Sequence, residues 1–180
     1  MKERPILFSG EMVRAILAGN KSQTRRVIQF PRKWIGIVDN DLRESGFWNT
    51  GEYWQYGDDR LPQNYQVGDR LWIRETWAIK DIARIWLEIT GVRVERLQDI
   101  SRDDAMFEGV ELVDPYKIAD IPPNIAFPAA FKDYKDASNF FTADPIHSFW
   151  SLWDSINAKR GYPWNSNPFV WVIKFERIER

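Results

Sequence analysis

Hydrophobic residues recur along this chain at two spacings, one typical of strands and one typical of helices. Segments with the two spacings follow one another, which predicts short helices placed between strands. Residues 4–9 form an apolar run of strand length, and residues 12–17 repeat apolar side chains at helical spacing. Ser9 precedes this helix as a candidate N-cap, and Gly19 stands where a left-handed C-cap is expected. Residues 20–26, which are all polar, therefore begin where a helix stops.

Strand-like patterns recur along the rest of the chain. They cover residues 24–30, 33–38, 46–57, 67–78, 83–100 and 168–179. The segment 46–57 is typical of an aromatic hairpin, and Gly91 predicts a bulge or bend inside the longest segment. A chain with this many strand signals needs a sheet as its main scaffold.

Two helices are predicted in the second half of the chain. Ser101 is the candidate cap of a short one that ends at Gly109. Asp144 is the candidate cap of a longer one, which starts at Pro145 and stops at Gly161. The first of these is short, and the second is the longer of the two predicted here.

This order of elements predicts an α+β protein, a small closed or nearly closed β-barrel of mixed strands with flanking short helices. A doubly wound sheet is not expected, because long crossover helices and a glycine-rich strand-to-helix turn are missing. We expect one domain over residues 1–180, with insertions at about 39–66 and 112–147. The second insertion is inferred from a proline-rich segment without a clear period.

Composition narrows the classes of function. The absence of cysteine excludes disulfides, thiolate nucleophiles and cysteine–zinc sites. No apolar run has the length of a signal peptide or a membrane span, so a soluble, cytoplasmic protein is expected. The chain has 25 basic and 26 acidic residues, so we do not expect it to bind nucleic acid through its overall charge. This balance still allows a local basic pocket. The ten tryptophans serve either a core or surfaces on which bases stack.

The motifs that the sequence lacks limit its candidate chemistry. His147 is the only histidine, and no serine-hydrolase elbow, phosphate-binding loop or zinc-protease motif is present. A hydroxyl nucleophile such as Thr24 then needs a lysine base, and burial and neighbouring cations lower a lysine pKa. Lys21 lies three residues before Thr24, and Arg25 and Arg26 follow it. The alternative is a polar turn in which Lys21 compensates the negative end of the helix.

Four blocks of the sequence resemble one known family. These are ILAGNKSQTRR, VGDRLWIRETWA, VERLQDISRDDAMFEGV and NPFVWVIKFER. The first resembles the GxKxxTxR signature of the ASCH domain family, a relative of the PUA RNA-binding barrels, and the four blocks follow the family's order over about half of the chain. The opening RPILFSGEMVRAILAG and the run WDSINAKRG are most similar to the larger ASCH proteins encoded by phages and prophages. The resemblance implies a PUA-like fold.

The resemblance also implies an activity. The family includes small bacterial amidohydrolases that remove the acetyl group from N4-acetylcytidine with a lysine, a threonine and a glutamate, which correspond to Lys21, Thr24 and Glu108. Lys21 would take the proton from Thr24, whose oxygen attacks the amide carbonyl. Glu108 would hold Lys21 or manage protons on the leaving amine. Arg26 or backbone N–H groups would stabilise the oxyanion, and neither a metal nor a cofactor is required.

Other residues in the matching blocks are candidates for contact with substrate. A pyrimidine would stack on Trp72, Trp77 or Trp171. Arg74 and Glu75 lie in WIRETW, where they serve either the site or only an ion pair on a strand. The implied partner is a small nucleoside or RNA and not a membrane, and the oligomeric state is left open.

Departures from the family pattern keep several alternatives open. Asn20 stands where the small enzymes often have a basic residue, and Ser22 stands where threonine is common. The chain is nearly twice the length of those enzymes, so the insertions could cover the site, change its substrate or close it. Besides the amidohydrolase, the alternatives are a reader of RNA or modified nucleosides, a ribonuclease, and a phage accessory protein without catalysis.

Overall fold

The computed structural model describes residues 1–30, 65–74, 85–114, 116, 129–135 and 141–179, and the backbone of residues 48–49, 53–56 and 59–62. The strands of its main sheet, in spatial order, are β1 (Glu3–Ile6), β6 (Arg70–Ile73), β7 (Trp86–Arg96), β10 (Phe169–Ile178) and β2 (Gln23–Val27). Two smaller sheets consist of β3 (Trp48–Asn49), β4 (Tyr53–Tyr56) and β5 (Asp59–Pro62), and of β8 (Phe131–Lys132) and β9 (Phe141–Thr142). The α-helices are α1 (Gly10–Leu17), α2 (Arg102–Phe107) and α4 (Pro145–Asn157), with 3-10 turns η3 (Leu97–Asp99), η4 (Ala158–Arg160) and η5 (Trp164–Ser166). The predicted α+β class is confirmed.

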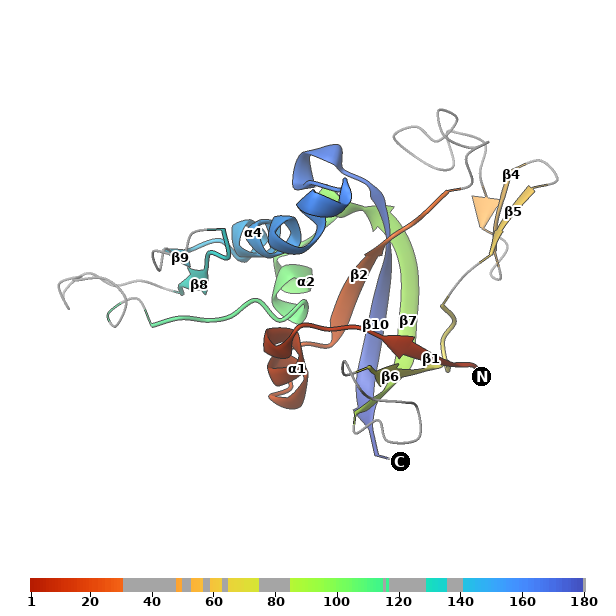
Figure 1. Cartoon of the computed structure of the whole chain (residues 1–180), viewed down its shortest axis with the longest axis horizontal. Helices are drawn as coiled ribbons and strands as arrows, with labels where there is room; N and C mark the ends of the chain where they lie inside the picture. Colours follow the sequence, from red (N-terminus) through yellow and green to blue (C-terminus); the bar gives the residue numbers. More distant parts are fainter. Residues whose placement is uncertain are drawn as a thin grey trace.

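The main sheet is mixed, and β2 is one of its two edge strands. β1 runs parallel to β6, whereas the other neighbouring strands are antiparallel. Figure 1 shows α1, α2 and α4 grouped on the β2 side of this sheet. In the long ladder between β7 and β10, the register shifts between Lys174 and Phe175, opposite Gly91, which confirms the predicted bulge.

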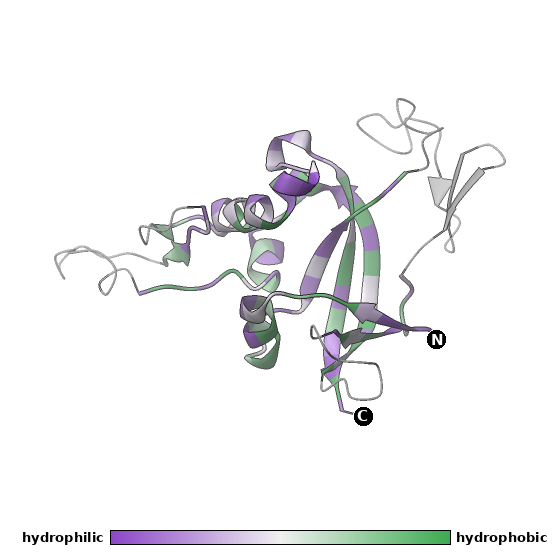
Figure 2. Cartoon of the chain, viewed as in Figure 1, coloured by the Kyte–Doolittle hydropathy of each residue, from purple (hydrophilic) through white to green (hydrophobic). Residues whose placement is uncertain are grey.

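Alternate residues of β10 contribute to two hydrophobic cores, as expected for a strand covered on both faces. Trp171 and Ile173 belong to a core with residues of β1, β6, β7 and α1. Val170 and Val172 belong to a second core with residues of α2 and α4. Hydrophobic and hydrophilic bands alternate along β7 and β10 (Figure 2). The central strand β10 is therefore packed on both faces, with α2 and α4 covering one of them.

Local capping places the helix ends where the sequence predicted them. The Ser9 hydroxyl accepts a hydrogen bond from the backbone N–H of Met12 at 3.4 Å, and the Ser101 hydroxyl accepts one from Asp104 at 3.1 Å. The Asp144 carboxylate accepts one from Ile146 at 3.1 Å at the start of α4. These caps fix where the three helices begin, and the opposite, C-terminal ends of α2 and α4 contribute to the functional site described below.

Several expectations stay predictions. No pairing between β1 and β2 is among the contacts of the described residues, so closure of the barrel is not established. Most of the two expected insertions, and the expected strand at 33–38, lie outside the described residues. Within the part of the chain that is described, no helix has the length and hydrophobicity needed to span a membrane.

Candidate functional site

Lys21 lies where the loop after α1 meets the end of α2, and its side chain is fully buried. Its Nζ atom donates to the backbone carbonyls of Gln23 at 2.8 Å and Glu108 at 2.7 Å, and to Glu108 Oε2 at 2.9 Å. Three acceptors match the three N–H bonds of an ammonium group, whereas a neutral amine has only two. The geometry therefore indicates a resting ammonium with no lone pair available.

Opposing effects act on the pKa of Lys21. Burial lowers this pKa, the charge and hydrogen bond of Glu108 raise it, and the charges of Arg26 and Arg25 lower it again. The net direction is downward, as the sequence predicted, and burial is the largest cause. Loss of a proton from Lys21 therefore costs less than it would on an exposed lysine, even though the resting contacts favour the charged form.

Glu108 belongs to a buried ionic cluster that also holds Arg25. The side chain of Arg25 is fully buried and donates from Nη1 to Glu108 Oε1 at 2.9 Å and from Nε to Glu95 Oε1 at 3.0 Å. Arg25 Nη2 also lies 3.3 Å from Asp104 Oδ2. Arg93 completes the cluster by pairing with both Glu95 and Asp104. The cluster therefore balances three cations with three carboxylates, the arrangement that buried charges require.

Sequence reasoning missed this cluster, although part of its signal is visible. The register pairs Val172 of β10 with Arg93 on one side and with Arg25 on the other, so these two arginines lie in one row of the sheet. Arg93 and Glu95 are two residues apart and share a strand face. The sequence indicated the cluster only through charged residues at alternate positions of a strand, on one of its faces.

Asp104 should make the stability of the protein depend on pH in acid. Burial raises the pKa of the Asp104 carboxyl, but the charges of Arg93 and Arg25 together lower it by more than burial raises it. The pKa of Asp104 in the folded protein is therefore below the ordinary 3.8. Because the ionised Asp104 is favoured in the folded state, it stabilises the fold above pH 3.8, and this stabilisation is lost as the pH falls through the folded-state pKa.

We expect the free energy of unfolding of Asp104→Asn, measured with urea, to fall less steeply than that of wild type between neutral and acid pH. Asp103→Asn, an exposed change in the same helical turn, should retain the wild-type slope. Equal slopes for wild type and Asp104→Asn would contradict the expectation.

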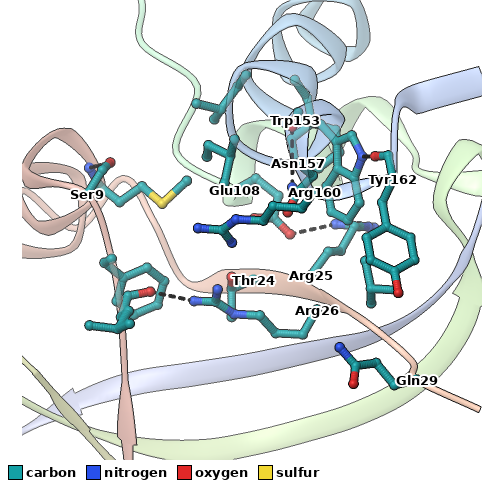
Figure 3. Close-up of a pocket in the computed structure, with 17 residues that line it drawn as sticks. Ser9, Thr24, Arg25, Arg26, Gln29, Glu108, Trp153, Asn157, Arg160 and Tyr162 are labelled. Atoms are coloured by element: carbon teal, nitrogen blue, oxygen red, sulfur yellow. Dashed lines mark hydrogen bonds and ion pairs between the residues drawn. The ribbon is translucent and has the colours of Figure 1, made fainter.

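A cavity of about 500 Å³ opens beside this cluster, at the free edge of β2. Its walls include Thr24 and Arg26 from β2, Glu108 from the end of α2, and Arg160 from η4 (Figure 3). Lys21 does not line the cavity but lies behind Glu108. The volume is within the range of sites that enclose small molecules.

Thr24 is only 4% exposed, yet it lines the cavity. No hydrogen bond from its hydroxyl is found among the described residues, and none joins it to Lys21. The hydroxyl is consequently available to a ligand, and the predicted contact between nucleophile and lysine base is not formed in this arrangement.

The free edge of β2 supplies backbone hydrogen-bonding groups to the same place. Ile28 donates to the carbonyl of Phe169 at 2.9 Å, and Phe175 donates to the carbonyl of Ser22 at 2.9 Å. In an antiparallel ladder the bonded residues alternate, so the N–H and C=O groups of Arg25 and Val27 point away from β10. Both residues line the cavity.

Arg26 is held at the cavity wall by two contacts. Its Nη2 donates to the carbonyl of Leu7 at 2.7 Å, and its guanidinium lies 5.3 Å from the ring centroid of Phe8. Burial lowers the pKa of Arg26, and the charge of Arg160 lowers it further, against the raising effects of Tyr65 and Glu108. The arginine is therefore ordered before any ligand arrives.

Three of the other predicted substrate contacts, Trp72, Trp171 and Arg74, are described and are not among the residues that line this cavity. Trp72 and Trp171 are 8% and 3% exposed, and neither is among its described lining residues. Arg74 is exposed, follows β6, and donates its backbone N–H to Ile6 at 2.9 Å. Glu75 and Trp77 lie outside the described residues. The structure thus brings Lys21, Thr24, Glu108 and Arg26 together, and their roles stay predictions.

The end of α4 adds residues that the sequence did not single out. Asn157, Arg160 and Tyr162 line the cavity, and all three come from the run that resembles larger ASCH proteins or directly follow it. Among the described residues, no group of three acidic or histidine side chains is arranged to hold a metal ion.

Gly109 allows Lys21 to pack against the end of α2. Its φ is +80°, and a Cβ added there would lie 2.8 Å from Lys21 Cβ. Gly19 has a similar φ of +78° with nothing within 4 Å of an added Cβ. Both alanine variants should lose about 1 kcal/mol from backbone strain. Gly109→Ala should lose on the order of 1–3 kcal/mol more in chemical denaturation, because Lys21 must move. Equal losses would show that the contact is unimportant.

Comparisons with known proteins give distant structural likenesses. No family profile and no curated protein matches the sequence. The structure is similar to that of the hypothetical protein PH0355, with a TM-score of 0.45, 11% identity, and coverage of 99% of this chain and 100% of that one. It is also similar to an ASCH domain from Lactobacillus crispatus JV V101, with a TM-score of 0.44, 13% identity, and coverage of 98% and 79%. Likeness at this level assigns neither a family nor an activity, so function is argued from the site.

Proposed function

We propose that this chain is an ASCH-type amidohydrolase that acts on an acylated pyrimidine nucleoside such as N4-acetylcytidine. The observation that carries the proposal is that the Thr24 hydroxyl, which has no described partner, and the Glu108 carboxylate line one cavity of nucleoside size. Lys21 is buried directly behind Glu108. These are the three residues that the sequence blocks indicate.

The proposed reaction is acyl transfer in two steps. Thr24 Oγ1 attacks the amide carbonyl carbon, its proton passes to a base, and the C–N bond then breaks as the exocyclic N4 amine of cytidine takes up a proton. Water hydrolyses the resulting acetyl ester and restores the Thr24 hydroxyl. Because all three Lys21 protons are engaged, Glu108 is the first proton acceptor in this scheme, and Lys21 keeps its carboxylate in place.

Donors for the developing oxyanion are available beside Thr24. The backbone N–H of Arg25 points to the free edge of β2, and the Arg26 guanidinium lines the same cavity. Groups that are already ordered before the reaction stabilise such a charge without the cost of reorganisation. The two donors belong to the first and second residues after Thr24 in the chain.

A second candidate is a binding module for modified nucleosides or RNA that performs no hydrolysis. It is favoured by one observation, the saturation of Lys21 by three acceptors without a described contact to Thr24. In this case the cavity would recognise the ligand through the β2 edge and Arg26. Binding would then survive removal of the Thr24 hydroxyl.

The deciding experiment is a chromatographic assay of the purified protein with N4-acetylcytidine, in which free cytidine is followed over time. Release of cytidine that is lost in the Thr24→Val variant would support the amidohydrolase. Folded protein that binds N4-acetylcytidine without releasing cytidine would overturn it in favour of the binding module.

A further inference from the structure

The cavity contains two cationic groups that form no ion pair within the described part of the chain. Arg26 comes from β2, and Arg160 comes from η4 at the end of α4. No ion pair of either residue is found among the described residues, in contrast to Arg25, which contacts three carboxylates. Figure 3 shows the Arg26 and Arg160 side chains near Thr24, both extending toward the side of the cavity on which Ser9 lies.

Two guanidinium groups facing one cavity oppose each other electrostatically, and an anion between them would relieve this. Glu108 lines the cavity and its charge acts on Arg26, but among the described residues it forms ion pairs only with Lys21 and Arg25 and none with Arg26 or Arg160. Arg26 Nε is buried and has no hydrogen-bond partner in the described structure. A buried donor without a partner costs free energy, which a ligand oxygen would recover.

The chemistry of arginine indicates which anion fits. Guanidinium groups present several N–H donors in a plane and suit oxyanions, phosphate in particular. Arg26 is already held by Leu7 and Phe8, so little side-chain entropy remains to be lost on binding. The cavity has room for a nucleoside beside the anion, since its volume is about 500 Å³.

We propose that Arg26 and Arg160 form a phosphate subsite, and that the molecule bound in the cavity is a nucleotide rather than a free nucleoside. The identity of its base rests on the function proposed above, whereas the anion does not. The phosphate could come from a mononucleotide or from a strand of RNA, because both present the same oxygens. With Arg26 engaged by the phosphate, the backbone N–H of Arg25 is the oxyanion donor that remains, and Arg160 would act in specificity.

The test is calorimetric titration of the full chain with cytidine, cytidine 5′-monophosphate, the dinucleotide cytidylyl-cytidine and inorganic phosphate. We expect the monophosphate to bind at least about tenfold more tightly than cytidine, with a preference that weakens as salt is added. Arg160→Gln should remove most of this preference. Lys159→Gln is the matched control, because Lys159 is an exposed neighbour in η4 that does not line the cavity. A tighter dinucleotide would identify RNA as the source of the phosphate.

Two results would overturn the subsite. One is equal affinity for cytidine and its monophosphate together with no binding of inorganic phosphate. The other is an equal loss in Arg160→Gln and Lys159→Gln, which would indicate only general charge. These binding measurements do not require turnover. Absence of hydrolysis with the preference intact would reject the proposed function alone, and hydrolysis without the preference would reject the subsite alone.

Discussion

Replacing Thr24 with valine should lower kcat for release of cytidine from N4-acetylcytidine by roughly 10³-fold or more. Valine keeps the branched shape of threonine and replaces the attacking oxygen with a methyl group. Since the hydroxyl has no described hydrogen bond, the fold should lose no more than about 1 kcal/mol. The measurement is a turnover assay beside a urea unfolding curve for the same preparation.

Thr24→Ser is the matched control for this prediction, because it retains a hydroxyl at the same backbone position. It should keep activity within about tenfold of wild type. Intact-mass analysis during turnover should detect an acetyl adduct in wild type and none in Thr24→Val. If the valine variant releases cytidine at the wild-type rate, water attacks the carbonyl directly and Thr24 only lines the cavity.

The parts of the structure that depend on neighbouring residues could be predicted from the sequence. Ser9 and Ser101 cap helices through bonds that span three residues, and Gly19 adopts the left-handed conformation where α1 ends. Gly91 lies beside the register shift of β7 and β10, and an isolated glycine inside a strand often marks such a bulge. Each of these features is decided within a few positions of the residue concerned.

The ionic cluster could not be predicted, because its contacts join distant segments. Arg25 meets Glu95 across 70 residues and Glu108 across 83. Local sequence shows the charges but not their pairing, and the family resemblance indicated only Lys21 and Glu108. Arg160 was missed for the same reason, since no local pattern shows that the end of α4 lies over β2.

The tryptophans show a related limit of sequence analysis. The sequence allowed Trp171 to serve either a core or a stacking surface, and its burial in the core beside Ile173 favours the first. The face that a strand residue takes depends on the register with its neighbours. That register becomes visible only when β7, β10 and β2 are aligned.

Glu108→Gln should lower the free energy of unfolding by about 3–5 kcal/mol, because it leaves the buried cations Lys21 and Arg25 without their shared carboxylate. The measurement is chemical denaturation at neutral pH, with the far-UV spectrum used to verify folding. Glu11→Gln is the control, since Glu11 pairs with Lys132 at 3.0 Å but is 45% exposed. That surface change should cost less than about 1 kcal/mol.

A double-mutant cycle with Lys21→Met distinguishes the charge from the packing. If the cost of Glu108→Gln arises from an uncompensated ammonium, removing that ammonium should make the second change cheaper by at least about 1 kcal/mol. Lys21→Met alone should also destabilise, because the carbonyls of Gln23 and Glu108 lose their donor. Strict additivity of the two changes would contradict the charge account. Glu108 would then stabilise the fold through Arg25, and Lys21 would be free to change its protonation during the reaction without loss of structure.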